Sequence, residues 1–155
     1  MAQERSQSSD NKTRNVRDVM TANPECVSEK DSLRDVARIM KDKDTGVVPV
    51  VDGKKVIGLI TDRDIVVRGL AEGKNLENAS VNDLMTRSVR SVRDDSSVND
   101  ALELMTKAEI RRVPVVNSND ELVGILSLGD IAVQGNQDNK VGRAVESISE
   151  APPNN

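Results

Sequence analysis

Apolar residues along this chain follow two periodicities, one typical of strands and one typical of helices. Residues 47–51 and 56–60 are short apolar runs joined by Asp52-Gly53, which predicts two buried strands in a β-hairpin. A helix is predicted before the hairpin, because apolar residues recur there at helical spacing: Leu33, Val36, Ala37 and Met40. Apolar residues resume after the second strand and predict a further short helix over residues 65–70.

This pattern occurs twice, and the second occurrence lies about 65 residues after the first. Three motifs recur in order: VRDVMT at 16–21 as VNDLMT at 81–86, VVPVV at 47–51 as RVPVV at 112–116, and VIGLITDRDI at 56–65 as LVGILSLGDI at 122–131. The chain is therefore expected to hold two β-α-β-β-α units, each beginning with a short extended segment near Val27 or Val92. Asp31-Ser32 and Ser96-Ser97 supply N-cap candidates for the helices that follow.

The expected organisation along the chain has five parts: a disordered N-terminal tail at 1–15, a first unit at 16–70, a linker at 71–80, a second unit at 81–134, and a C-terminal amphipathic helix and tail at 135–155. The two units are called copy one and copy two below. The C-terminal helix is predicted from apolar residues at helical spacing: Val141, Ala144, Val145 and Ile148.

The composition narrows the classes of function open to the chain. It contains no Phe, Tyr, Trp or His, so aromatic stacking platforms, the commonest general base and the commonest metal ligand are all missing. The net charge of −4 argues further against a nucleic-acid partner. The single Cys26 cannot form an internal disulfide, and no apolar run reaches the roughly 18–20 residues of a membrane span. We therefore expect a cytoplasmic protein with no membrane partner.

Three charges separate an apolar strand from an apolar helix at the sequence TDRD. Thr61, Arg63 and Asp64 could hold a nucleotide, because hydroxyl and guanidinium groups donate to phosphate and a carboxylate accepts from ribose hydroxyls. Thr61 or Asp62 could equally cap the helix, with Arg63 as a solvated neighbour. Copy two retains the hydroxyl and the last carboxylate as Ser127 and Asp130. If a cap requires only the first polar residue, the recurrence of both the hydroxyl and the carboxylate favours a binding role that the two copies share.

The apolar strand followed by Asp62 and Asp64 also fits the loose pattern of haloacid-dehalogenase-type phosphatases, in which the first Asp is the nucleophile. The duplication argues against this interpretation, because copy two has Leu128 at the position of the nucleophile Asp62 but retains an aspartate, Asp130, at the position of Asp64. An enzyme is therefore not the expected class.

The duplicated pattern of Met-Thr, then Val-Pro-Val-Val, then Gly and two apolar residues before Thr/Ser-x-x-Asp resembles the cystathionine-β-synthase (CBS) domain family over residues 16–134. Two copies form a tandem pair, or Bateman module. The resemblance implies an α+β fold of two β-α-β-β-α units related by pseudo-two-fold symmetry, with their sheets facing each other. It also implies two clefts that bind AMP, ADP, ATP or a related adenosyl ligand such as S-adenosylmethionine, with no other cofactor required.

The resemblance assigns roles to the polar residues of both turns. Asp64 and Asp130 would take the ribose hydroxyls, while Thr61 and Ser127 would approach phosphate. The family also builds each cleft from both copies. Carried over to this chain, Thr45, Gly46 and Pro24 would face the ligand at Ser127 and Asp130, and Ile110, Arg111 and Val89 the ligand at Thr61 and Asp64.

A basic residue just before the Val-Pro-Val strand contacts phosphate in nucleotide-binding members and corresponds to Arg112, with Arg111 beside it. Copy one has Val47 and Gly46 at these positions, so the two sites are expected to differ, with Arg63 as a compensating charge. The arginine pair could instead be edge-strand charges that deter aggregation.

The sequence thus predicts a non-catalytic, nucleotide-sensing regulatory module. The resemblance further implies a homodimer in which four units form a disc, acting on a protein partner that the sequence does not name. The alternative hypothesis is a scaffolding module with degenerate ligand sites that acts through protein contacts alone.

Overall fold

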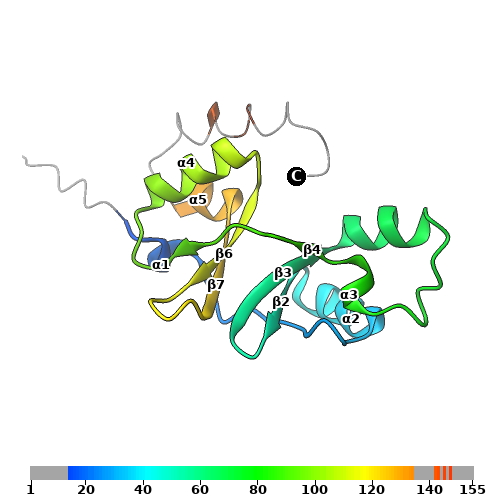
Figure 1. Cartoon of the computed structure of the whole chain (residues 1–155). Helices are drawn as coiled ribbons and strands as arrows, with labels where there is room; N and C mark the ends of the chain where they lie inside the picture. Colours follow the sequence, from blue (N-terminus) through cyan, green and yellow to red (C-terminus); the bar gives the residue numbers. More distant parts are fainter. Residues whose placement is uncertain (1–13, 135–141, 144, 146, 148–155) are drawn as a thin grey trace, which may run out of the picture.

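The computed structural model describes residues 14–134, 142–143, 145 and 147 (Figure 1). Copy one contributes α1 (Val16–Val19), β1 (Thr21–Ala22), α2 (Leu33–Lys43), β2 (Val47–Asp52), β3 (Lys55–Thr61) and η1 (Asp64–Leu70), a helix of π geometry. Copy two contributes α3 (Val81–Leu84), β4 (Thr86–Arg87), β5 (Val92–Arg93), α4 (Val98–Ala108), β6 (Arg112–Val116), β7 (Leu122–Ser127) and α5 (Leu128–Gln134).

Both predicted hairpins form, and both predicted long helices are capped as expected. Strands β2 and β3 pair antiparallel around Gly53, whose φ of 62° is the left-handed conformation that the turn requires. The Ser32 hydroxyl accepts from Asp35 N at 3.1 Å, and the Ser97 hydroxyl accepts from Asp100 N at 3.0 Å. The α+β expectation of two β-α-β-β-α units is confirmed. The repeat did not predict the short helices α1 and α3.

The first strand of each copy lies in the sheet of the other copy. The sheets have the orders β1-β7-β6-β5 and β2-β3-β4. Strand β1 of copy one pairs with β7 of copy two, with Thr21 opposite Ile125. Strand β4 of copy two pairs with β3 of copy one, with Thr86 opposite Leu59. The chain therefore crosses between the two sheets at the start of each repeat.

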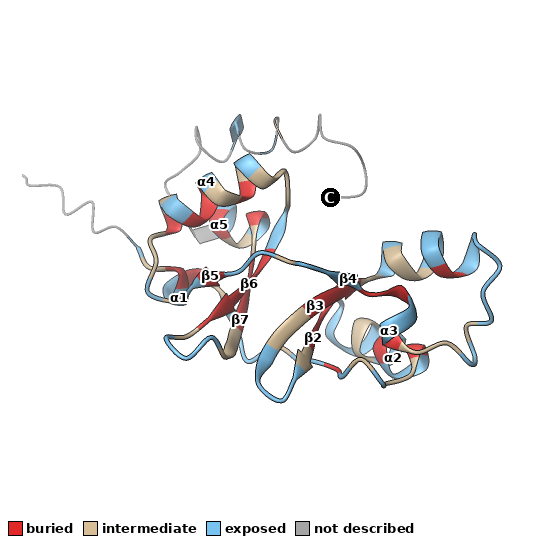
Figure 2. Ribbon diagram, in the orientation of Figure 1, coloured by how far each residue is buried: buried red, intermediate tan, exposed pale blue. Residues whose placement is uncertain are grey.

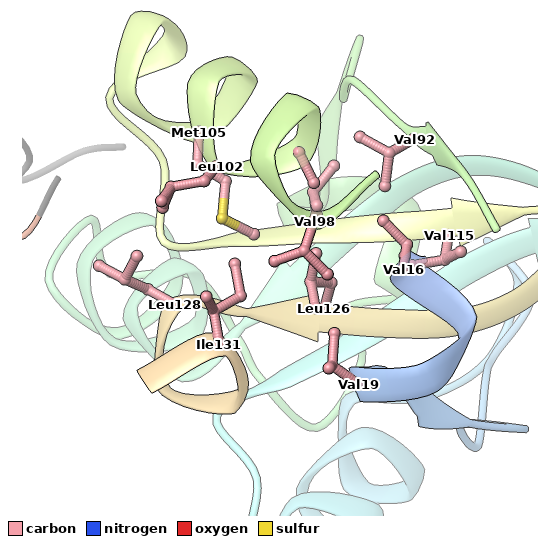
Figure 3. Packing of buried hydrophobic residues seen from close by; sticks show 12 residues of the cluster. Val16, Val19, Val92, Val98, Leu102, Met105, Val115, Leu126, Leu128 and Ile131 are labelled. Atoms are coloured by element: carbon pink, nitrogen blue, oxygen red, sulfur yellow. The ribbon is translucent and has the colours of Figure 1, made fainter. Parts of the chain in front are cut away.

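Each of the two hydrophobic cores likewise contains residues from both copies. Val16 and Val19 of α1 are buried in one cluster with copy-two residues such as Leu126 and Ile131 (Figure 3). Buried residues on the strands and helices of each half mark two separate cores (Figure 2). The copy-one core contains Leu84 and its neighbours from copy two: Val81 and Met85. Each copy thus completes its core with the first helix of the other copy.

A glycine at the same place in each repeat permits this crossing. A Cβ on Gly58 would lie 2.4 Å from the Thr86 carbonyl oxygen and 2.3 Å from Met85 Cε. A Cβ on Gly124 would lie 2.4 Å from Met20 Sδ and 3.0 Å from the Thr21 carbonyl oxygen. The Met-Thr motif of one copy therefore packs directly on the strand glycine of the other.

The two sheets also meet through a small apolar cluster and their hairpin turns. Val47 and Leu59 of copy one are buried against Ile125 of copy two, with Val89 packed beside them. At the turns, Leu122 N donates to the Lys54 carbonyl at 2.9 Å, and Lys54 forms an ion pair with Glu121 at 3.6 Å. The hydrogen bond from Asn117, followed by the Lys54 charge, lowers the pKa of Glu121.

The predictions for the two ends of the chain mostly concern residues that the structure does not describe. Residues 1–13 of the predicted disordered tail lie outside the described residues. Arg14 and Asn15 do not follow that expectation, because Val98 N donates to the Arg14 carbonyl at 2.8 Å and Asn15 forms the N-cap of α1. Val141, Ala144 and Ile148 of the predicted C-terminal helix are also outside, whereas Val145 is helical and exposed. In the described part of the chain, no helix has the length and apolarity to cross a membrane.

Candidate functional site

The strand-to-helix turns of the two copies share one hydrogen-bond pattern. Thr61 N donates to Asp64 Oδ2 and Asp64 N donates to Thr61 Oγ1, both at 3.0 Å. In copy two, Ser127 N donates to Asp130 Oδ2 at 2.9 Å and Asp130 N donates to Ser127 Oγ at 3.0 Å. Each turn is thus a reciprocal capping box at the start of its helix.

This geometry overturns one step of the sequence argument. The sequence interpretation takes the recurrence of hydroxyl and carboxylate three residues apart as favouring ligand binding, on the ground that a cap requires only the first polar residue. That step is wrong, since a capping box requires both residues at this spacing. The recurrence of Thr/Ser-x-x-Asp is explained by helix capping, and a binding role needs other support.

In copy two, other polar groups adjoin the turn. Arg112 and Ser127 are directly opposite each other in the antiparallel β6–β7 pair, so their side chains lie on the same face of the sheet. Leu128 N donates to the Arg111 carbonyl at 2.9 Å, which places the arginine pair against the turn. Both arginines are exposed. Among residues 14–134, no ion pair or side-chain hydrogen bond holds either guanidinium.

Copy one presents a different environment around the equivalent turn. Val47 is opposite Thr61 in the β2–β3 pair and is buried between the two sheets. The Asp64 side chain is only 12% exposed, and its carboxylate accepts from the Thr86 hydroxyl at 3.3 Å. Arg68 approaches the same carboxylate at 3.8 Å. The expected difference between the two sites therefore extends beyond the missing basic residue.

Thr86 and Arg68 are functional candidates that the sequence reasoning missed. Thr86 belongs to the Met-Thr motif, whose recurrence was recognised without any indication that it crosses to the other copy. Arg68 had a positional signal in the sequence, because it follows Asp64 by four residues on a predicted helix, a spacing at which opposite charges pair.

The structure leaves the crossed cleft assignments as predictions. The Gly46 carbonyl accepts from Asp62 N at 3.0 Å, so Gly46 adjoins the turn of its own copy, as Arg111 does. Arg63 is exposed in the same turn. Val89 does lie between the copies, whereas the remaining three predicted lining residues are each partly buried: Pro24, Thr45 and Ile110.

The other features of the described residues do not form a second candidate functional site. A surface hollow of about 390 Å³ is lined by linker and α3 residues, none of them predicted site residues: Lys74, Asn75, Asn78, Ala79 and Asp83. Partial burial, followed by the nearby Asp31 and Glu25 carboxylates, raises the pKa of the Cys26 thiol. Among the residues described, no three acidic, cysteine or histidine side chains cluster in a way that could hold a metal ion.

A family model for the CBS domain matches the chain twice, over residues 16–69 and 81–134. The chain belongs to the CBS domain family. The two matches coincide with the internal repeat and confirm the resemblance to a tandem CBS pair.

Relatives of this CBS pair include proteins with bound adenosyl ligands. YlbB of Bacillus subtilis is 38% identical over 137 residues, which span 87% of this chain and 91% of that protein. The structure of CBSX2 in complex with AMP is 30% identical, with a TM-score of 0.65, and the match covers 77% of this chain and 93% of that one. The CBS pair of MJ0100, in complex with 5′-methylthioadenosine and S-adenosyl-L-methionine, is 30% identical with a TM-score of 0.69, over 77% and 98% of the two chains.

Proposed function

We propose that this CBS pair is a regulatory module that binds an adenosine nucleotide, or a related adenosyl ligand, at the turn between β7 and α5. The observation that carries the proposal is the placement of Arg112 beside Ser127, with Asp130 in the same turn. The guanidinium supplies a charged donor for phosphate, and the carboxylate supplies acceptors for ribose hydroxyls. The adenosyl ligands of CBSX2 and MJ0100 support this ligand class.

The equivalent turn of copy one, with Thr61, Arg63 and Asp64, is the second candidate position. The remaining lining residues are proposed from the resemblance: Pro24, Thr45, Gly46, Val89, Ile110 and Arg111. No other cofactor is proposed.

A non-catalytic role is proposed for the module. The chain contains no histidine, and the raised pKa of Cys26 leaves its thiol mostly protonated at neutral pH. Binding would then act through a change in conformation or in contacts with a partner. We further propose a cytoplasmic homodimer, supported by the exposed apolar side chains of η1: Val66, Val67 and Leu70.

A scaffolding module with degenerate sites is the second candidate. The observation in its favour is that capping boxes account for the polar residues of both turns without a ligand. The two functions differ in whether any adenosyl ligand stabilises the protein.

Adenosine nucleotides are expected to raise the melting temperature in a dye-based thermal-shift screen of AMP, ADP, ATP and S-adenosylmethionine. A ligand at 100 times its Kd adds roughly 2.7 kcal/mol. For a chain of this size that corresponds to roughly 5–10 °C. Arg112→Ala should reduce the shift, because losing a charge-assisted hydrogen bond weakens binding by about 10- to 150-fold.

Arg38→Ala is the matched control, because Arg38 is an exposed arginine of α2 whose ion pair is with Asp35 rather than with a residue of either turn. It should leave the ligand-induced shift unchanged. A flat response of the wild type to all four ligands would favour the scaffolding function, and an unchanged shift in Arg112→Ala would remove Arg112 from the site.

A further inference from the structure

The Asp64 carboxylate is already occupied by groups of this chain. It accepts from Thr61 N at 3.0 Å as part of the capping box. The Thr86 hydroxyl, which comes from β4 of copy two, donates to the same carboxylate at 3.3 Å. Arg68 places its guanidinium 3.8 Å from Oδ1. The carboxylate is thus surrounded by donors and is largely screened from solvent.

Arg68 is itself held in this position from a second side. Its Nη1 donates to the carbonyls of Leu84 at 3.4 Å and Met85 at 3.3 Å, at the end of α3. Gly69 is buried, and a Cβ there would lie 2.7 Å from Leu76 and 3.0 Å from Leu84, so η1 packs closely on α3. The guanidinium therefore bridges the Asp64 carboxylate and two carbonyls of copy two.

Copy two lacks this arrangement around its own carboxylate. Among the described residues, the capping contact with Ser127 is the only hydrogen bond or ion pair of Asp130. Gln134 stands where the repeat places Arg68 in copy one, so no cation occupies that position. Thr21 corresponds to Thr86, and the structure gives it no bond to Asp130.

We infer that Arg68 and Thr86 form an internal latch that closes the copy-one site, so that the chain takes one adenosyl ligand, at Asp130. The inference rests on the proposed function and specifies which of its two sites operates. A ribose at Asp64 would have to compete with the Thr86 hydroxyl for a carboxylate that is only 12% exposed and already pairs with Arg68. At Asp130 the ribose displaces no such partner.

The test is a calorimetric titration of AMP into the full chain, comparing wild type with an Arg68→Gln, Thr86→Val double variant. We expect one site per chain in the wild type and two in the double variant, because Asp64 is then open. Arg34→Gln is the matched control, since Arg34 forms an exposed ion pair with Glu77 at 2.8 Å and not with the carboxylate of either turn. It should keep one site.

The titration tests the latch and the proposed function through two different results. The latch is read from the gain in sites between wild type and double variant: a gain of one supports it, and no gain overturns it. Two sites in the wild type would also overturn it. The proposed function is read from the wild type alone, because the absence of any site there contradicts binding at Asp130. If the double variant does not fold, as circular dichroism would reveal, Arg68→Gln alone must add a weaker second site, and its failure to do so overturns the latch.

Discussion

Replacing Leu84 with alanine is expected to lower the free energy of unfolding by about 2–5 kcal/mol, the cost of a large cavity in a packed core. Leu84 is fully buried, and its cluster is formed mainly by copy-one residues such as Val48 and Ile60. The lost protection against amide hydrogen exchange should therefore fall mainly in β2 and β3, although Leu84 belongs to copy two in the sequence. Chemical denaturation and hydrogen-exchange mass spectrometry measure the two effects.

Leu102→Ala is the matched control for this prediction. Leu102 is a buried leucine of the same copy, and it packs in the copy-two core with Leu126. Its replacement should lower the free energy of unfolding by a similar amount but increase amide hydrogen exchange in β6 and β7. If Leu84→Ala released exchange in β6 and β7 instead, the crossing of the two cores would be contradicted.

Gly58→Ala is expected to cost about 3 kcal/mol, at the upper end for overpacking a core. The added Cβ would lie 2.4 Å from the Thr86 carbonyl, and a backbone carbonyl inside a paired strand has little room to move. Gly124→Ala should cost less, because the added Cβ would lie 3.0 Å from the nearest backbone carbonyl, that of Thr21, and its closer contact is with the flexible Met20 side chain. Thermal and urea unfolding measure both changes.

Gly129→Ala serves as the control for added bulk. Gly129 lies in α5, and the nearest atom to an added Cβ is Ser127 Oγ at 3.6 Å, an ordinary contact. Alanine has the higher helix propensity, so this variant should be neutral or stabilised by up to about 1 kcal/mol. Equal stability of Gly58→Ala and Gly129→Ala would contradict the close approach of β4 to β3.

The sequence predicts the local elements well because periodicity reports local burial. The hairpin at Asp52-Gly53 and the helix from Leu33 appear as the apolar spacing indicates. Periodicity carries no information on which sheet a two-residue strand joins, so the pairing of β1 with β7 was not predicted. The glycines at 58 and 124 were visible within the repeated motifs, but the role of each depends on contact with the Met-Thr segment of the other copy.

The sequence predicted which residues lie at the candidate site, but not that they also cap the helix that follows. The sequence identified Thr61 and Asp64, and the structure adds that they cap η1 before any ligand is considered. The contact of Asp64 with Arg68 lies within η1 and follows from their four-residue spacing, whereas the contact with Thr86 arises from packing between copies, which a single sequence does not show. The absence of a basic residue at Val47 was visible in the sequence, and burial of Val47 between the sheets accounts for it.

The most direct test of the central claim is a double-mutant cycle on the contact between Asp130 and a ribose. AMP and 2′-deoxy-AMP are titrated by calorimetry into wild type and Asp130→Asn, a variant that keeps the size and one acceptor of the side chain. We predict that wild type binds AMP more tightly than the deoxy ligand, by about 10-fold or more, and that Asp130→Asn costs less affinity for 2′-deoxy-AMP than for AMP. Any effect of the substitution on the capping box cancels in this difference. Equal losses with both ligands, or no loss with either, would contradict direct binding of the ribose by Asp130.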